Sequence, residues 1–401
     1  MTDLRTWILV AVALGLLACT PEAPRSPDGT SEAPAPEAIE SAAAADPGRR
    51  VNTEYAGIVL HQVAAGLEHP WAIAFLPDGG MLVTERPGRL KRIDDEGTTE
   101  VAGLPDDIVA INQGGLMDVV LHPAFAENAW VYLTYSKGTP EATATTLIRG
   151  RLEGDALLDV EELFTQDRMS DPGRHYGSRL AFMPDGTLLM SIGDRGVDPP
   201  RAQDLGDHAG SLLRLNDDGS VPADNPFVGR DDVLPEIYSY GHRNIQGLIV
   251  HPETGAIWAT EHGPRGGDEL NLVKPGQNYG WPVVSRGRNY RTEDTYFEDT
   301  QRSKEGMVDP VIDWTPSLAA SGLAYVDGER FPRWKGNLLA GGLRAEQVRR
   351  VVFDGDEVVH EEELIRGMVG RVRDVRIGPG GDIYVLTDQR DGGVYRIEPA
   401  G

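Results

Sequence analysis

The segment Arg179-Leu-Ala-Phe-Met-Pro-Asp-Gly-Thr-Leu-Leu-Met-Ser191 consists of two short apolar runs on either side of a Pro-Asp-Gly turn. Apolar runs of this length, bounded by turn residues, are typical of β-strands, and the turn joins them into a β-hairpin. From residue 51 onward we find no long segment with helical periodicity. The same unit recurs five more times, at residues 71–84, 116–134, 246–259, 322–340 and 372–386. The sequence therefore predicts an all-β protein.

Six hairpin units predict a six-bladed β-propeller, because radial repetition leaves only short strand edges exposed. The ring of such a propeller has to close. We expect the strand-like segment Gly57–Val63 to complete the last blade, which ends near Val394–Ile397. A β-sandwich or two smaller β domains is the alternative, since hairpins alone do not force closure. In a propeller the functional residues lie on loops at one face, and the long loops are predicted at 136–146, 199–231 and 285–308.

Composition excludes several classes of protein. The 401 residues include 48 Gly and 28 Pro, which favours many turns. The formal net charge of −25 opposes binding along a phosphate backbone, so a nucleic-acid partner is excluded. The single cysteine, Cys19, excludes an intramolecular disulfide and a cysteine-based metal site. Any metal site would have to use oxygen or imidazole ligands.

The N-terminal residues are predicted to be a targeting signal. The apolar run Trp7–Leu17 is too short to span a membrane as a helix, and Leu-Leu-Ala-Cys19 follows it as in bacterial lipoproteins. We therefore expect a lipoprotein signal peptide at 1–18, a lipid anchor on Cys19, a disordered Ala/Pro/Glu-rich tether at 19–50 and the propeller at 51–401. Thr20 after the cysteine favours the outer membrane, facing the periplasm. The alternative is a buried helix with one inert cysteine.

One polar cluster indicates acid–base chemistry. His175 precedes the hairpin 179–191 and Asp194 follows it, and a hairpin brings its two ends together. A carboxylate beside an imidazole orients the ring and raises its basicity, as proton abstraction requires. The alternative for His175 is an ordinary turn or core histidine. His122 and His251 are weaker candidates, because each is part of a His-Pro turn.

Three further clusters indicate ligand binding. Arg243 and Asn244 stand at the entry of a predicted strand and could clamp a planar acid. Arg371 and Arg373 are two residues apart on a strand, so both side chains project to one face and need an anion between them. That anion is either a ligand or an acidic residue of the chain itself. The loop 261–282 combines Gly, Pro and carboxylates, an oxygen-rich set that suits calcium or simply a solvated loop.

Five motifs together carry a resemblance to a known family. They are the segment around His175, Gly-His-Arg-Asn-Ile-Gln-Gly-Leu at 241–248, Glu-His-Gly-Pro with Gly-Gly-Asp-Glu-Leu-Asn at 261–271, Asn-Tyr-Gly-Trp-Pro at 278–282 and Arg-Val-Arg-Asp at 371–374. In this order they resemble the soluble pyrroloquinoline quinone (PQQ) sugar dehydrogenases, the glucose/sorbosone dehydrogenase-like proteins. The aldose sugar dehydrogenase branch is the more similar one, because His262 stands where the glucose dehydrogenase branch has Gln.

The resemblance implies oxidation of an aldose at its anomeric carbon to the lactone, with PQQ and Ca²⁺ as cofactors. His175 would be the general base, oriented by Asp194. The implied contacts to PQQ come from polar side chains spread over most of the chain, namely Gln113, Arg243, Asn244, Tyr290, Arg344, Arg371 and Arg373. The carbonyls of Gly263 and Pro264 would hold one calcium ion, and Glu269 with Tyr279 would hold a second, structural one.

Two positions depart from the family pattern. Arg344 occupies a position where the glucose dehydrogenase branch has Lys, which puts its role in cofactor positioning in doubt, and Ile245 replaces the usual Pro. The competing hypotheses are a calcium-dependent lactonase or hydrolase propeller and a non-catalytic propeller that binds a sugar or an envelope protein. The expected partners are an aldose and an unidentified electron acceptor, and the expected state is a monomer.

Overall fold

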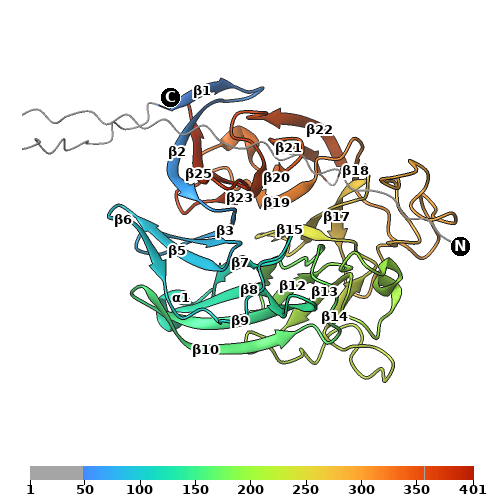
Figure 1. Cartoon of the computed structure of the whole chain (residues 1–401). Coiled ribbons are helices and arrows are strands. Elements are labelled where there is room, and N and C mark those ends of the chain that lie inside the picture. The colour runs from blue at the N-terminus through green and yellow to red at the C-terminus, as the bar shows by residue number, and fades with distance from the viewer. Residues whose placement is uncertain (1–47, 356) are drawn as a thin grey trace, which may run out of the picture. The chain divides into compact units, whose positions relative to one another are not determined.

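The computed structural model describes residues 48–355 and 357–401. Within them six antiparallel sheets surround a common centre, and the innermost strands β3, β7, β15, β19 and β23 gather there (Figure 1). The innermost strand of each sheet contacts the innermost strands of the sheets on both sides, around the whole ring. The predicted six-bladed β-propeller is therefore confirmed.

The first three blades follow the chain in order, each from its innermost strand outward. In blade 3 the pair β11–β12 is the hairpin from which the fold was predicted. The strands of these three blades are β3 (Pro70–Phe75), β4 (Met81–Glu85), β5 (Arg89–Asp94) and β6 (Gly97–Val101); β7 (Leu116–Leu121), β8 (Trp130–Gly138), β9 (Thr143–Glu153) and β10 (Ala156–Thr165); and β11 (Leu180–Phe182), β12 (Leu188–Ile192), β13 (Ser211–Leu215) and β14 (Ile237–Tyr240).

The last three blades repeat this arrangement, except that the sixth takes its outer strands from the start of the described chain. Their strands are β15 (Ile245–Val250), β16 (Ile257–Glu261), β17 (Asp268–Val273) and β18 (Ile312–Trp314); β19 (Ala320–Tyr325), β20 (Leu338–Gly342), β21 (Gln347–Asp354) and β22 (Glu357–Leu364); and β23 (Val372–Ile377), β24 (Ile383–Thr387), β25 (Gly392–Pro399), β2 (Gly57–Leu67) and β1 (Arg49–Asn52).

The ring closes where β2 pairs with β25. The two strands run antiparallel, with Leu60 opposite Ile397. The prediction that Gly57–Val63 completes the last blade is confirmed, and the two ends of the propeller are joined by backbone hydrogen bonds. Because β1 begins at Arg49, the sheet starts two residues inside the segment predicted as a tether.

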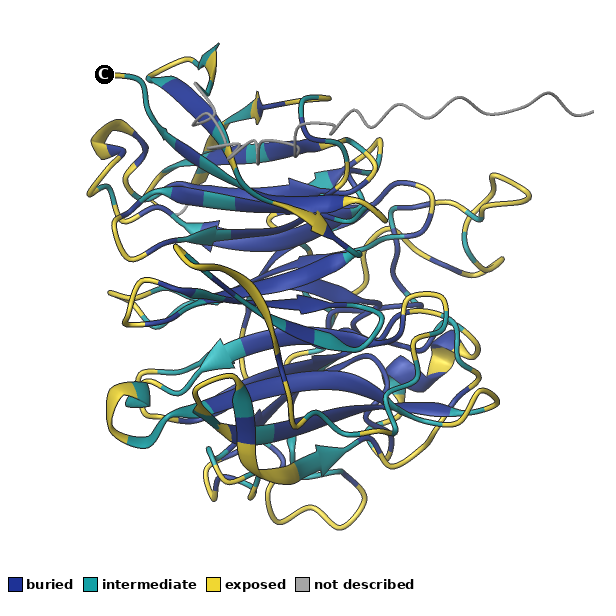
Figure 2. Cartoon of the chain, turned by 60° about the vertical axis from the view of Figure 1, so that its left-hand side comes forward, coloured by how far each residue is buried: buried dark blue, intermediate teal, exposed yellow. Residues whose placement is uncertain are grey.

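The hydrophobic core is divided into six layers, one between each pair of neighbouring blades. Figure 2 shows that most buried residues lie on the strands and most exposed ones in the loops. The layer between blades 6 and 1, which contains Leu67, Val83 and Val394, is built like the other five. Apolar side chains that alternate along each strand reach the layers on both sides of a blade. A continuous series of packed layers holds the loops at the centre of the ring in fixed positions.

Two of the three predictions of long loops are wrong in part. Residues 136–146 are largely strand, because β8 continues to Gly138 and β9 begins at Thr143 in a segment rich in β-branched threonines. Residues 199–231 contain the 3₁₀ helix η1 (Pro199–Gln203) and the fully buried strand β13. Residues 285–308 form the predicted loop between β17 and β18. The remaining helical turns are α1 (Phe125–Asn128) and η2 (Pro332–Trp334).

The predicted signal peptide at 1–18 and the lipid-anchor residue Cys19 lie outside the described residues, as does the tether up to residue 47. Within the described part of the chain, no helix has the length and apolar character needed to cross a membrane.

Candidate active site

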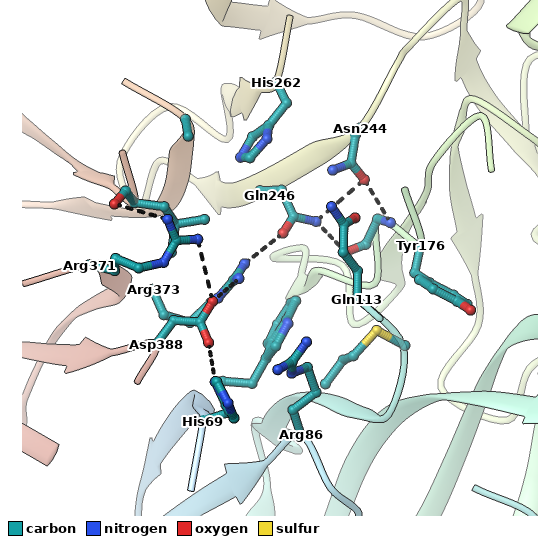
Figure 3. A pocket seen from close by; sticks show the side chains of 15 residues that line it. His69, Arg86, Gln113, Tyr176, Asn244, Gln246, His262, Arg371, Arg373 and Asp388 are labelled. Atoms are coloured by element: carbon teal, nitrogen blue, oxygen red, sulfur yellow. Dashed lines mark hydrogen bonds and ion pairs between the residues drawn. The ribbon is translucent and has the colours of Figure 1, made fainter. Parts of the chain in front are cut away.

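A cavity of about 510 Å³ opens at the centre of the propeller (Figure 3). Every blade contributes to its lining, through residues on or beside the innermost strand. Going around the ring, these residues are Trp71, Met117, Gly177, Gln246, Ala319 and Arg373. The fold thus brings together side chains that are about 300 residues apart in the sequence.

His175 and Asp194 form a buried pair beside this cavity. His175 Nδ1 lies 2.6 Å from Asp194 Oδ1, and both side chains are almost completely inaccessible to solvent. His175 precedes β11 and Asp194 follows β12, so the hairpin brings them together as predicted. The approach is close because Gly193 has no side chain, since a Cβ atom there would collide with the His175 carbonyl.

Two further donors hold the carboxylate of Asp194. Trp281 Nε1 donates to Oδ2 at 2.7 Å, and the backbone N–H of Gly196 donates to Oδ1 at 2.8 Å. Burial opposes ionisation, but His175 and Arg243 keep the pKa of Asp194 below its usual range. Asp194 is therefore an ionised acceptor, and the proton shared with the imidazole belongs to Nδ1 of His175.

His175 is neutral at ordinary pH. Burial and the positive charge of Arg243 lower its pKa to about 4, against the opposing effect of Asp194. With Nδ1–H donated to Asp194, Nε2 carries the free lone pair, and among the described residues it has no hydrogen-bond partner. A neutral imidazole with an oriented, unoccupied nitrogen is suited to accept a proton from a ligand.

Arginines line the opposite part of the central cavity, around one carboxylate. Arg373 lies 2.7 Å and Arg371 3.7 Å from Asp388 Oδ2, and His69 Nδ1 lies 2.8 Å from Oδ1 (Figure 3). Arg86 lines the same cavity. The hypothesis that an acidic residue of the chain separates the two arginines is confirmed in Asp388. Three guanidiniums face one carboxylate, however, and the cavity keeps a surplus of positive charge.

Several predicted cofactor contacts belong to this cavity. Gln113 and Asn244 line it, and each also supports the backbone around His175: Gln113 Oε1 accepts from His175 N at 2.9 Å, and Asn244 Oδ1 accepts from Gly177 N at 3.1 Å. Arg243 lines an adjoining small cavity and donates to the Gly263 carbonyl at 2.8 Å. The Nε atoms of Arg243 and Arg373 are buried and lack partners among the described residues, which suits an anionic ligand.

The structure does not bring Arg344 or Tyr290 into the central cavity. Arg344 follows β20 directly after Leu343, and Leu343 takes the position in the lining. Arg344 instead lines a separate cavity of about 480 Å³ beside Asp313. Tyr290 is 61 % exposed in the loop 285–308. Neither residue therefore lines the central cavity, since neighbouring residues of a strand end face opposite ways and Tyr290 lies at the surface.

Three of the four residues predicted to bind calcium line a small cavity of about 10 Å³, roughly the space of one water molecule. Glu261, Gly263, Glu269 and Tyr279 line it. Pro264 does not, because it packs at the neighbouring Gly287. The Tyr279 hydroxyl donates to Leu272 O at 2.8 Å, so its phenolic oxygen is already engaged.

The oxygen atoms around this cavity fit a single cation. Burial and the neighbouring Glu261 raise the pKa of Glu269 to about 8, and Asn271 Nδ2 donates to Glu269 Oε2 at 3.1 Å. Carboxylate and amide oxygens are the ligands that Ca²⁺ prefers. The described residues contain no group of three or more His, Cys, Asp or Glu that could hold a metal, so amide or carbonyl oxygens would have to complete the ligands. The Gly263 carbonyl already faces one positive group, Arg243.

Sequence analysis missed several residues of the site. Trp281 and Gln246 lie inside recognised motifs, but nothing in the sequence pairs Trp281 with Asp194. Nor does the sequence pair Gln246 with Arg373, which donates a hydrogen bond to Gln246 Oε1 at 3.0 Å. His69, Arg86 and Asp388 lie on loops after unrelated strands, and only ring closure brings them together.

Comparison with known proteins agrees with this geometry. The sequence profile of the family described as "Glucose / Sorbosone dehydrogenase" matches residues 67–396. Aldose sugar dehydrogenase YliI of Escherichia coli is 40% identical over 342 residues, which cover 83% of this chain and 91% of the relative. The apo-form crystal structure of the soluble aldose sugar dehydrogenase of Escherichia coli has a TM-score of 0.82 at 38% identity, covering 86% of this chain and 100% of the other.

A ligand-bound relative has also been solved. The PQQ-bound form of the aldose sugar dehydrogenase of Streptomyces coelicolor has a TM-score of 0.71 at 28% identity, and the match covers 85% of this chain and 98% of the other. The resemblance carried by the five motifs is thereby confirmed. The chain belongs to the glucose/sorbosone dehydrogenase family, whose members are oxidoreductases acting on sugars.

Proposed function

We propose that this protein oxidises aldose sugars at the anomeric carbon to the corresponding lactone, with PQQ and Ca²⁺ as cofactors. The observation that carries the proposal is the position of a neutral, oriented His175 beside an arginine-lined cavity of about 510 Å³. A base and an anion-binding cavity at one place are what a dehydrogenase with an acidic quinone requires. Family membership supports the same reading.

The arginine side of the cavity would hold the cofactor. PQQ carries three carboxylates, and Arg371, Arg373 and Arg86 offer three guanidiniums in a fixed arrangement. Asp388 contacts two of them and so keeps like charges from repelling one another before a ligand binds. Arg373 and Asp388 are both nine-tenths buried, so their contribution is little screened by solvent.

His175 would take the proton of the anomeric hydroxyl at Nε2. Asp194 holds the ring in position and stabilises the imidazolium that forms, while the Trp281 indole keeps the carboxylate from rotating. When bound, the quinone would accept the hydride and calcium would polarise the quinone carbonyl. Burial of the pair excludes water, which strengthens both interactions.

Calcium would bind in the region of the small cavity. Glu269 and Glu261 fit a structural ion, with the Tyr279 carbonyl as a further ligand. The Gly263 carbonyl would contribute to the ion beside the quinone, where Arg243 now donates to it. Binding at this carbonyl requires that Arg243 shares or releases its hydrogen bond.

We also propose that the protein works in the periplasm, anchored to the outer membrane by a lipid on Cys19. The support is the sequence alone: a short apolar run, Leu-Leu-Ala-Cys19 and the Ala/Pro/Glu-rich residues after it. Mass spectrometry of the membrane fraction tests this proposal, since a diacylated Cys19 is expected and an unmodified N-terminus contradicts it.

The activity is tested by dye reduction with a panel of aldoses, with and without added PQQ and Ca²⁺. We expect reduction only when both are present, and its loss in His175→Ala. His251→Ala is the matched control, because His251 caps an exposed turn through Glu253 N and Thr254 N, packs against Tyr325 and does not line the central cavity. Absence of aldose-dependent reduction in the fully supplemented wild type contradicts the proposal.

A further inference from the structure

A second cavity, of about 540 Å³, borders the catalytic pair. It shares Gln113 with the central cavity, and Gln113 holds the backbone N–H of His175. The rest of its lining flanks both members of the pair, with Gly173 and Arg174 before His175 and residues 195–197 after Asp194. The two cavities thus approach each other at the residue that supports His175.

The side chain of Arg174 is exposed and makes a hydrogen bond across the lining of this cavity. Nη2 of Arg174 donates to the Gly196 carbonyl at 3.2 Å, and a Cβ atom on Gly196 would lie only 2.6 Å from Arg174 Cγ and Nε. The guanidinium thus rests on a glycine that has room for it. Among the described residues no carboxylate lies within 4.0 Å of it, so the charge of Arg174 is not paired.

A second guanidinium strengthens the positive charge of this cavity. Arg195 is fully buried, stacks 3.6 Å from the ring centroid of Tyr176, and donates to the Arg174 carbonyl at 2.8 Å. Its Nε has no partner in the described part of the chain, and no ion pair neutralises it there. Asp171 is the one acidic side chain of the lining. In a chain with net charge −25, two unpaired arginines at one cavity select for an anion.

We propose that this second cavity is a subsite for the anionic end of an aldose, so that the preferred substrates carry a carboxylate or phosphate remote from the anomeric carbon. A hexuronic acid fits the first case and a hexose 6-phosphate the second. Arg174 would bind the anion directly. Arg195 would hold the Arg174 backbone, and its positive charge would attract the same anion. The inference names the substrate class and rests on the proposed sugar oxidation.

The test compares matched pairs of sugars on the holoenzyme: galacturonate with galactose, and glucose 6-phosphate with glucose. We expect kcat/KM to favour at least one anionic member, and the ratio of anionic to neutral kcat/KM to fall about tenfold in Arg174→Gln. Arg174→Lys should restore part of that ratio. Arg151→Gln, an equal loss of charge at the far end of β9, should leave the ratio unchanged. The sugar pair whose kcat/KM ratio falls in Arg174→Gln shows whether the subsite binds a carboxylate or a phosphate.

A binding measurement separates this inference from the oxidation itself. Calorimetry on the cofactor-free full chain should detect galacturonate or glucose 6-phosphate binding that Arg174→Gln weakens, with no such effect on galactose. Equal kcat/KM for anionic and neutral sugars, or an unchanged ratio in Arg174→Gln, overturns the subsite. A protein that oxidises no sugar but binds the anionic one through Arg174 overturns the proposed function and leaves the subsite standing.

Discussion

The indole N–H of Trp281 donates a hydrogen bond to Asp194 at 2.7 Å, from a loop that lies 87 residues farther along the chain. Asp194 uses its other oxygen to hold His175. His175 is therefore positioned through two successive contacts, and the outer one comes from blade 4. Trp281 also packs against Tyr296 at a centroid distance of 4.7 Å, which fixes the plane of the indole.

Trp281→Phe should lower kcat about tenfold while KM for a neutral aldose changes little. The variant keeps the aromatic ring but removes the donor, so Asp194 can rotate away from His175, and a charge-assisted hydrogen bond is worth roughly 1.5–3 kcal/mol. Steady-state kinetics measures the effect. Trp258→Phe, on β16 of blade 4 and packed against Phe353, is the control and should keep full activity. An unchanged kcat in Trp281→Phe contradicts the positioning role.

Enzyme activity should begin to fall with acidification only at a pH far below the ordinary pKa of histidine. Because burial and Arg243 lower the pKa of His175 to about 4, the base stays neutral as the pH falls through 6.5 and becomes protonated only near pH 4. NMR titration of the ring in the cofactor-free protein measures this directly, with His175→Ala used to assign the signal. A midpoint at or above 6.5 refutes the electrostatic account.

Calcium should stabilise the protein most at high pH. The pKa of Glu269 is raised in the folded state to about 8 from an unfolded value of 4.5, so its contribution to stability is complete below pH 4.5 and is lost as the pH rises through 8. Urea unfolding in the presence of a chelator should show this loss, and added Ca²⁺ should reverse it at pH 8 with release of a proton.

Glu269→Gln should abolish both the pH effect and the calcium effect attributed to this site. Glu96→Gln, in an exposed turn, should preserve them. A chelated wild type as stable at pH 8 as at pH 5, or a calcium response that survives Glu269→Gln, would show that the ion binds elsewhere.

Asp118→Ala should destabilise the propeller by about 3–5 kcal/mol, the range observed when one partner of a buried ion pair is removed. Asp118 lies 3.3 Å from Arg179 and 2.9 Å from Arg376, and all three are at least four-fifths buried where blades 2, 3 and 6 meet. Urea denaturation measures the loss, and Asp159→Ala at the surface is the control. A change below about 1 kcal/mol would mean that the arginines find other partners.

Much of the fold was predictable because each blade begins with a local hairpin. A Pro-Asp-Gly turn such as that at Asp185 determines its two strands without reference to the rest of the chain. The strands outside this hairpin were harder to predict, because their pairing depends on neighbours that no local turn specifies. Strand β13, for example, is a short apolar run in a polar context, and only its position between β12 and β14 makes it a strand.

The site was predictable where its residues are close in sequence. His175 and Asp194 belong to one hairpin, and Arg371 and Arg373 to one strand end. Asp388 could not be predicted in this way, because its partnership with His69 depends on the pairing of the first and last strands of the ring. Arg344 was placed by resemblance alone, and the direction of its side chain depends on strand register that no motif encodes.

The central claim, that the arginine-lined cavity binds PQQ, is tested most directly by calorimetric titration of PQQ into the calcium-loaded protein. Arg373 lines this cavity and Arg344 lies outside it, and replacing either arginine by glutamine removes one positive charge. We predict that Arg373→Gln weakens binding at least about tenfold and that Arg344→Gln leaves it unchanged. Equal weakening by both variants, or no binding to the wild type, would contradict the account.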